Sequence, residues 1–79
     1  MKITICYFAM LREQARRDEE TRETSAATIA ALYAELARTY QFTIPETALR
    51  AAVNGAFVAM NTALHDGDEV TFIPPVAGG

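Results

Sequence analysis

The sequence predicts an α+β domain in which one main helix packs on a mixed β-sheet. Three observations carry this prediction: an alternating strand near the start, one amphipathic stripe between residues 29 and 40, and a hairpin turn at Asn54-Gly55. With 79 residues, the chain is long enough for a single hydrophobic core and too short for two. We therefore expect one domain over residues 1–79 with an extended tail over residues 74–79.

The first strand is expected over residues 2–8, where β-branched and aromatic residues alternate with polar ones. This period of two turns Ile3, Ile5 and Tyr7 toward the core. The charged run from Arg12 to Glu23 predicts a solvated surface. Within it we expect one helical turn at the start and a polar edge strand over residues 21–24.

The main helix is expected over residues 29–40, because its apolar residues repeat with a helical period. They are Ile29, Leu32, Tyr33, Leu36, Ala37 and Tyr40. Thr28 or Ser25 can cap its N-terminus. The helix cannot continue through Pro45, which lies in the connection of residues 41–47.

A hairpin and a last strand complete the sheet. Asn54-Gly55 predicts a two-residue type I′ turn, so that Val53 and Ala56 share one face and Phe57 points to the other. The turn Asp66-Gly67-Asp68 leads into a strand over residues 69–73 that ends at Pro74-Pro75. In this strand Val70 and Phe72 are the expected inward pair.

The order strand, strand, helix, hairpin, strand is that of the ubiquitin-like β-grasp fold. In this fold the first and last strands lie parallel and adjacent at the sheet centre, which would place Phe8 beside Ile73.

Composition excludes several classes of function. The net charge of −3, with Lys2 as the one lysine, argues against nucleic acid as a partner. The single cysteine, Cys6, cannot form an internal disulfide, and we expect a cytoplasmic protein. The apolar stretch of residues 5–11 lacks a cleavage site and is too short to span a membrane, so we expect a soluble, unprocessed chain.

Few residues offer chemistry of their own. Cys6 with His65 could form a nucleophilic pair, but two unremarkable residues are favoured. Asp66, Asp68 and Glu69 could bind a cation, but they lack calcium-loop spacing and a solvated turn is favoured. The sequence has neither a phosphate loop nor zinc spacing. We therefore expect no metal site, and a chain that is not an enzyme on its own.

Two features point to a partner protein. Phe8, Phe57 and Ile73 are large apolar residues on the outward side of the expected sheet, where they predict a contact patch rather than scattered surface residues. The ending Pro74-Pro75-Val76-Ala77-Gly78-Gly79 could be a frayed terminus. Alternatively, a tail with such small side chains can thread a narrow channel and present its carboxylate inside another protein.

Four motifs together resemble the small subunits of molybdopterin synthase. They are Phe8-Ala9-x-x-Arg12-Glu13, Ala52-Val53-Asn54, the turn from Asp66 to Val70, and the Pro-Pro-Val-Ala-Gly-Gly ending. A Gly-Gly end is shared with ubiquitin and with the sulfur carrier of thiamine synthesis. The combination of Phe-Ala-x-x-Arg-Glu with Pro-Pro favours the molybdopterin family.

The resemblance implies a carrier whose Gly79 carboxylate is adenylated by an ATP-dependent activating enzyme and converted to a thiocarboxylate. It would then donate sulfur, inside the large catalytic subunit, to form the dithiolene of molybdopterin. Phe8, Arg12, Phe57 and Ile73 would contact partners, and the chain itself would bind no cofactor. A ubiquitin-like modifier or adaptor, conjugated through Gly79 or docking by its patch, and the thiamine sulfur carrier stay open as alternatives.

Overall fold

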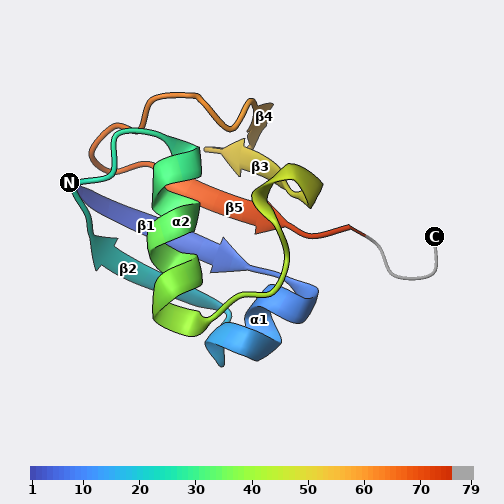
Figure 1. The fold of residues 1–79 in the computed structure, drawn as a ribbon. Helices are drawn as coiled ribbons and strands as arrows, with labels where there is room; N and C mark the ends of the chain where they lie inside the picture. The colour runs from blue at the N-terminus through green and yellow to red at the C-terminus, as the bar shows by residue number, and fades with distance from the viewer. Residues whose placement is uncertain (76–79) are drawn as a thin grey trace.

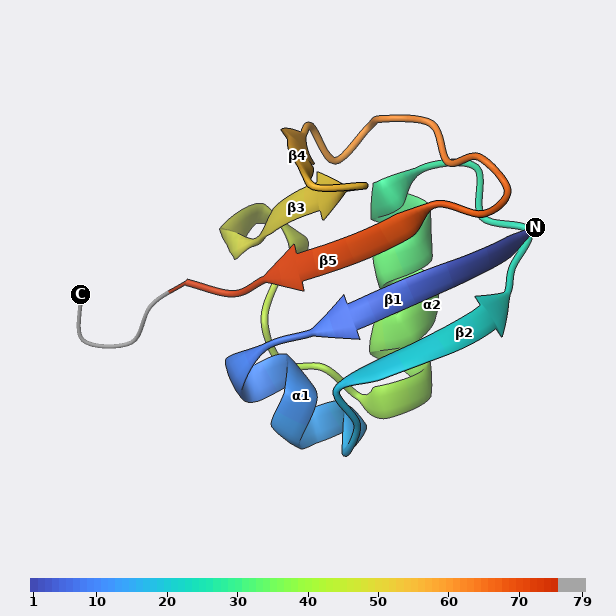
Figure 2. The ribbon, with the colours of Figure 1, turned by 180° about the vertical axis from the view of Figure 1, so that it is seen from behind.

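A computed structural model of the chain describes residues 1–75. Its elements, in chain order, are β1 (Lys2–Tyr7), α1 (Ala9–Ala15), β2 (Glu19–Glu23), α2 (Ile29–Tyr40), the 3-10 helix η1 (Glu46–Ala48), β3 (Arg50–Val53), β4 (Ala56–Val58) and β5 (Glu69–Ile73). The strands form one sheet in the order β2-β1-β5-β3-β4. Helix α2 covers one face of the sheet and leaves the other face open (Figures 1 and 2). This is the expected β-grasp architecture.

The central strands β1 and β5 run parallel, in a register that pairs Thr4 with Glu69 and Tyr7 with Phe72. The neighbouring pairs β1–β2, β3–β5 and β3–β4 are all antiparallel. Both central strands therefore end at the same edge of the sheet, and the chain leaves that edge from two adjacent points (Figure 2).

The core lies between the sheet and α2, as the periodicity predicts. The inward residues Ile3, Ile5, Val70 and Phe72 are fully buried, and so are the α2 residues Ile29, Leu32 and Leu36. Thr28 caps α2, its hydroxyl accepting a hydrogen bond of 3.1 Å from the amide of Ala31. Helix α2 has 12 residues, and no helix within residues 1–75 is long and apolar enough to cross a membrane.

Two short helices differ from the expectation. The single turn expected after Arg12 is instead α1, which begins three residues earlier at Ala9. Leu11 and Ala15 are buried and lie one turn apart, so they dock α1 onto the core although charged residues surround them in sequence. The helix η1 was not expected, because its three residues include none that is buried.

The charged run is not a purely solvated surface. The edge strand occupies Glu19–Glu23, two residues earlier than expected, and pairs antiparallel with β1. The carboxylate of Glu20 accepts hydrogen bonds from the hydroxyls of Tyr7, at 2.5 Å, and Tyr40, at 2.7 Å. Arg22 Nε donates to Glu35 Oε2 at 2.8 Å. These bonds tie the edge strand to α2 across the rim of the core.

Glu35 should make stability depend on pH. Burial alone would raise the pKa of its carboxyl, but hydrogen bonds from Arg22 and Thr24 and the charge of Arg22 outweigh burial and lower the pKa below its ordinary 4.5. A lowered pKa stabilises the fold above pH 4.5, and this contribution is lost as the pH falls through the folded-state value. We expect Glu35→Gln to cost about 1 to 3 kcal/mol at pH 7.

Urea unfolding of both proteins checks this prediction. The difference in unfolding free energy should narrow as the pH is lowered from neutral toward the acid range. Glu23→Gln is the control, because Glu23 is 74% exposed and its ion pair with the N-terminus contributes little. A difference that stays constant with pH would contradict the role given to Glu35.

The two sides of the sheet should respond differently to charge. Phe72 is fully buried, whereas Phe57 is 72% exposed. We expect Phe72→Asp to unfold the domain, because it combines a large loss of core volume with a buried charge. Phe57→Asp should change stability by no more than about 0.5 kcal/mol. Circular dichroism decides, and an unfolded Phe57→Asp variant would show the assignment of faces to be wrong.

Candidate partner-binding site

The tail leaves the fold at the end of the central strand. Strand β5 ends at Ile73; Pro74 is buried and Pro75 is exposed. Proline has no backbone N–H, so the hydrogen-bond ladder cannot continue along the tail. The expected end of the last strand before Pro74 is therefore confirmed, while the expected tail residues Val76, Ala77, Gly78 and Gly79 lie outside the described part of the chain.

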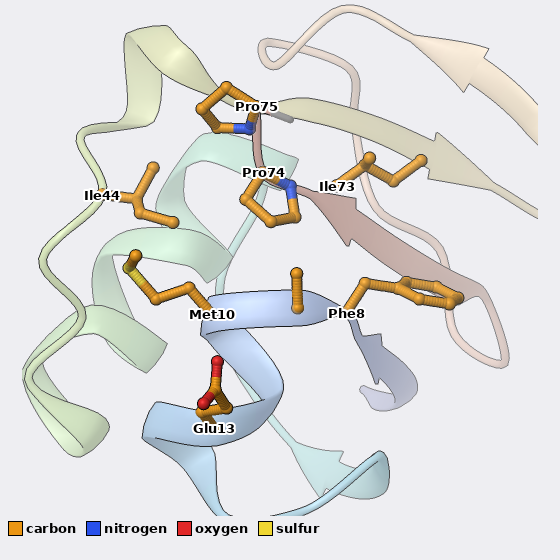
Figure 3. A pocket seen from close by; sticks show the side chains of 8 residues that line it. Phe8, Met10, Glu13, Ile44, Ile73, Pro74 and Pro75 are labelled. Atoms are coloured by element: carbon orange, nitrogen blue, oxygen red, sulfur yellow. The ribbon is translucent and has the colours of Figure 1, made fainter. Parts of the chain in front are cut away.

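A groove of about 750 Å³ opens where the tail leaves the fold. Its walls come from the start of α1, from the loop after α2 and from the end of β5 (Figure 3). We call it the tail-base groove; its lining residues are Phe8, Ala9, Met10, Glu13, Ile44, Ile73, Pro74 and Pro75. Seven of these side chains are apolar and one is a carboxylate, so the groove suits an apolar ligand surface.

Hydrogen bonds hold two walls of the tail-base groove in place. The Gln14 amide nitrogen donates to the Thr43 hydroxyl at 2.8 Å, and the Thr43 amide donates to the Gln14 amide oxygen at 3.2 Å. The Tyr33 hydroxyl donates to the carbonyl of Ile44 at 2.6 Å. Burial raises the pKa of Tyr33, so its hydroxyl keeps the proton that it donates. The groove is thus formed before any partner arrives.

The structure brings together two of the four expected interface residues. Phe8 is 50% exposed, and it lines the tail-base groove together with Ile73, as the parallel pairing predicts. Phe57 lies on the edge strand β4, on the open face of the sheet and outside the groove. Arg12 lies on α1, where its Nε is 3.7 Å from Asp18 Oδ1, and it does not line the groove.

Sequence reasoning did not find Met10 and Ile44 as groove residues. Met10 is 48% exposed, one of few large apolar side chains so accessible in the described chain. The sequence showed that Met10 is apolar, but α1 was not predicted to begin at Ala9, so the side of the molecule that Met10 faces could not be assigned. Ile44 lies in an irregular loop and had no local pattern.

The candidate nucleophile is not supported. Burial first, and then the charges of Glu69 and Glu19, raise the pKa of the Cys6 thiol, which disfavours the reactive thiolate. His65 instead lies with its Nδ1 3.9 Å from Asp68 Oδ2. Within residues 1–75, no three histidine, cysteine or acidic side chains are placed to hold a metal ion.

The acidic turn is solvated at Asp66 and Glu69, as expected, but Asp68 is buried. Asp68 accepts hydrogen bonds from the Asn54 side chain, at 3.0 Å, and from the His65 amide, at 2.9 Å. Asp66 accepts from the amide of Lys2 at 2.7 Å. These carboxylates join the start of β5 to β1 and to the hairpin, at the edge of the sheet opposite the tail.

Known proteins are similar in sequence to this chain over nearly their whole length. The chain is 35% identical to the molybdopterin synthase sulfur carrier subunit of Escherichia coli over 80 residues, covering 98% of this chain and 99% of that protein. It is 33% identical to the protein of the same name from Mycobacterium tuberculosis, covering 100% of this chain and 99% of that protein.

Solved structures agree with the fold. A putative molybdopterin converting factor, subunit 1, from Pyrococcus furiosus is 31% identical with a TM-score of 0.78, covering 96% of this chain and 99% of that one. Two more distant structures share the fold. Small archaeal modifier protein 1 of Methanosarcina acetivorans has 23% identity and a TM-score of 0.77, covering 99% and 96%. A complex of subunits 1 and 2 of molybdopterin-converting factor from Helicobacter pylori has 22% identity and a TM-score of 0.68, and the match covers 100% of this chain and 100% of that one.

A family model for the ThiS family matches residues 5–79, which include the second half of β1, all of β5, the residues of the tail-base groove and the Gly-Gly ending. Together with full-length relatives above 30% identity, this match shows that the chain belongs to the ThiS family.

Proposed function

We propose that this protein is the sulfur carrier subunit of a molybdopterin synthase and that the carboxylate of Gly79 carries the sulfur. The observation that supports this most directly is where the tail begins. It continues the central strand, is anchored by buried Pro74 and leaves beside a preformed apolar groove. The fold thus offers a partner both a docking surface and a chain end of small residues.

The proposed chemistry needs an activating step. A terminal carboxylate has a pKa of about 3.3 to 3.7, so it is ionised at neutral pH and is a poor electrophile. An ATP-dependent activating enzyme would transfer AMP to the Gly79 carboxylate with release of pyrophosphate. Sulfur at the oxidation level of hydrosulfide would then attack the acyl carbon and displace AMP, leaving a thiocarboxylate at Gly79. Its soft sulfur is the nucleophile that the pterin precursor requires.

The proposed partners supply what this chain does not. The large catalytic subunit would take up the tail and provide the acid-base groups, and the activating enzyme would bind ATP. Phe8, Phe57, Ile73 and Arg12 remain our proposed contacts, with Phe8 and Ile73 at the tail base. We place this reaction in the cytoplasm, where ATP is available, and assign the chain itself no cofactor, metal, nucleic acid or membrane.

The main alternative is a ubiquitin-like modifier joined through Gly79 to a lysine of a target protein. The two functions differ in the covalent species that they produce. A sulfur carrier alternates between carboxylate and thiocarboxylate and keeps its size, whereas a modifier accumulates in heavier isopeptide-linked species. The similarity to sulfur carrier subunits over the full length favours the carrier. An intact mass of the protein from its own cells separates the two.

Incubation with the cognate activating enzyme, ATP and a sulfur donor should add the mass difference between sulfur and oxygen. Tandem mass spectrometry should locate the change at Gly79, because that residue carries the proposed electrophile. A Cys6→Ser variant is the control and should be loaded equally. Sulfur found on Cys6 instead would contradict the proposal.

Changes in the tail should separate folding from transfer. Gly78→Val should leave the melting temperature unchanged, because it lies beyond β5, the last strand, which ends at Ile73. It should nevertheless block sulfur loading or transfer if the partner channel leaves no room for a side chain. Removal of Gly79 should abolish molybdopterin formation and largely preserve affinity for the large subunit. A reconstituted assay and calorimetry measure both. Full activity without Gly79 would refute the assignment.

A further inference from the structure

The charged pair in the Phe-Ala-x-x-Arg-Glu motif is divided between two environments. Arg12 has an internal partner, because its Nε lies 3.7 Å from Asp18 Oδ1. Glu13 is exposed and lines the tail-base groove. Within residues 1–75 its carboxylate takes part in neither an ion pair nor a side-chain hydrogen bond. Both side chains are exposed, but of the two only Glu13 lines the groove and has no charged partner within residues 1–75.

Glu13 is also the one charged residue among eight that line the groove. Figure 3 shows its carboxylate on α1 directed toward Met10, with Ile44, Pro74 and Pro75 around the same opening. A partner that takes up the tail must cover Ile73, Pro74 and Pro75, because the tail leaves through them. Those residues line the same groove as Glu13, so the partner covers its carboxylate as well.

Covering an isolated carboxylate is costly unless a positive group meets it. A purely apolar partner residue would fill the groove and leave Glu13 desolvated without compensation. A lysine or arginine matches both parts of the site. Its aliphatic stem packs on apolar walls while its cationic head reaches a carboxylate at the rim.

We propose that the tail-base groove receives a lysine or arginine side chain of the large catalytic subunit, with its stem against Met10, Ile44 and Pro75 and its cation paired with Glu13. This inference rests on the proposed function, which supplies the identity of the partner. It adds an orienting contact: the basic residue sets how the large subunit sits around the tail as the tail enters.

Calorimetric titration of the large subunit of the same organism tests the proposal. Glu13→Gln keeps the size of the side chain and should weaken binding at least about tenfold. Glu13→Lys should weaken it further. Glu23→Gln, which removes a carboxylate exposed at the far edge of the sheet, is the matched control and should bind as the unchanged protein does. The Glu13 variants should keep the melting temperature, because Glu13 has no ion pair or side-chain hydrogen bond within residues 1–75.

Salt and charge exchange give two further readouts. The affinity of the unchanged protein should fall more steeply with salt than that of Glu13→Gln, because one ion pair is lost in the variant. Changing the paired basic residue of the large subunit to glutamate should restore binding of Glu13→Lys.

The outcomes separate this inference from the proposed function. Binding of the unchanged protein together with Glu13→Gln affinity within twofold of it would overturn the role of the groove and leave the sulfur carrier function standing. If Glu13→Gln weakens binding to the activating enzyme and leaves binding to the large subunit unchanged, the choice of the large subunit as partner is wrong. Absence of any binding to the large subunit would contradict the proposed function and this inference together.

Discussion

The parallel pairing of β1 with β5 is the constraint on which the site depends. Parallel neighbours end at the same edge of a sheet, so the chain segment after β1 and the chain segment after β5 must emerge side by side. The pairing is held at its start by backbone hydrogen bonds from Gly67 to Lys2, at 2.8 Å, and from Thr4 to Asp68, at 3.0 Å. This register is what places Phe8 and Ile73 in the same groove.

The third wall of the tail-base groove depends on a different part of the chain. Helix α2 ends at Tyr40, and the next residue, Gln41, takes the left-handed conformation with a φ of 58°. The loop that follows is returned toward α1 and fixed there by Gln14 and Tyr33. The groove therefore combines the central pairing, the end of the main helix and the docking of α1. Loss of any one of these would open it.

Sequence patterns predicted the elements whose residues repeat with a regular period. Strand β1, helix α2, the Asn54-Gly55 hairpin and strand β5 were found because each buries one face and repeats accordingly. For the groove, the sequence predicted only the residues that follow from the pairing of β1 with β5. These are Phe8, Ile73 and the start of the tail.

The remaining features depend on contacts between distant residues. Helix α1 begins at Ala9 with a φ of 51° and has no side-chain cap, so the usual signals of a helix start are missing. The contact of Gln14 with Thr43 spans 29 residues, and a local pattern carries no information about it. For the same reason, the sequence did not show that Glu13 lines the groove while Arg12 lies near Asp18.

The placement of β5 also determines how the protein bears a mechanical load. A pull on the chain where it leaves the sheet would act on β5, which is bonded to β1 on one side and to β3 on the other. The force then acts in shear across both ladders at once, because their hydrogen bonds lie across the strands rather than along them. A pull on the chain at Pro75 would thus load both neighbouring strands of the sheet together.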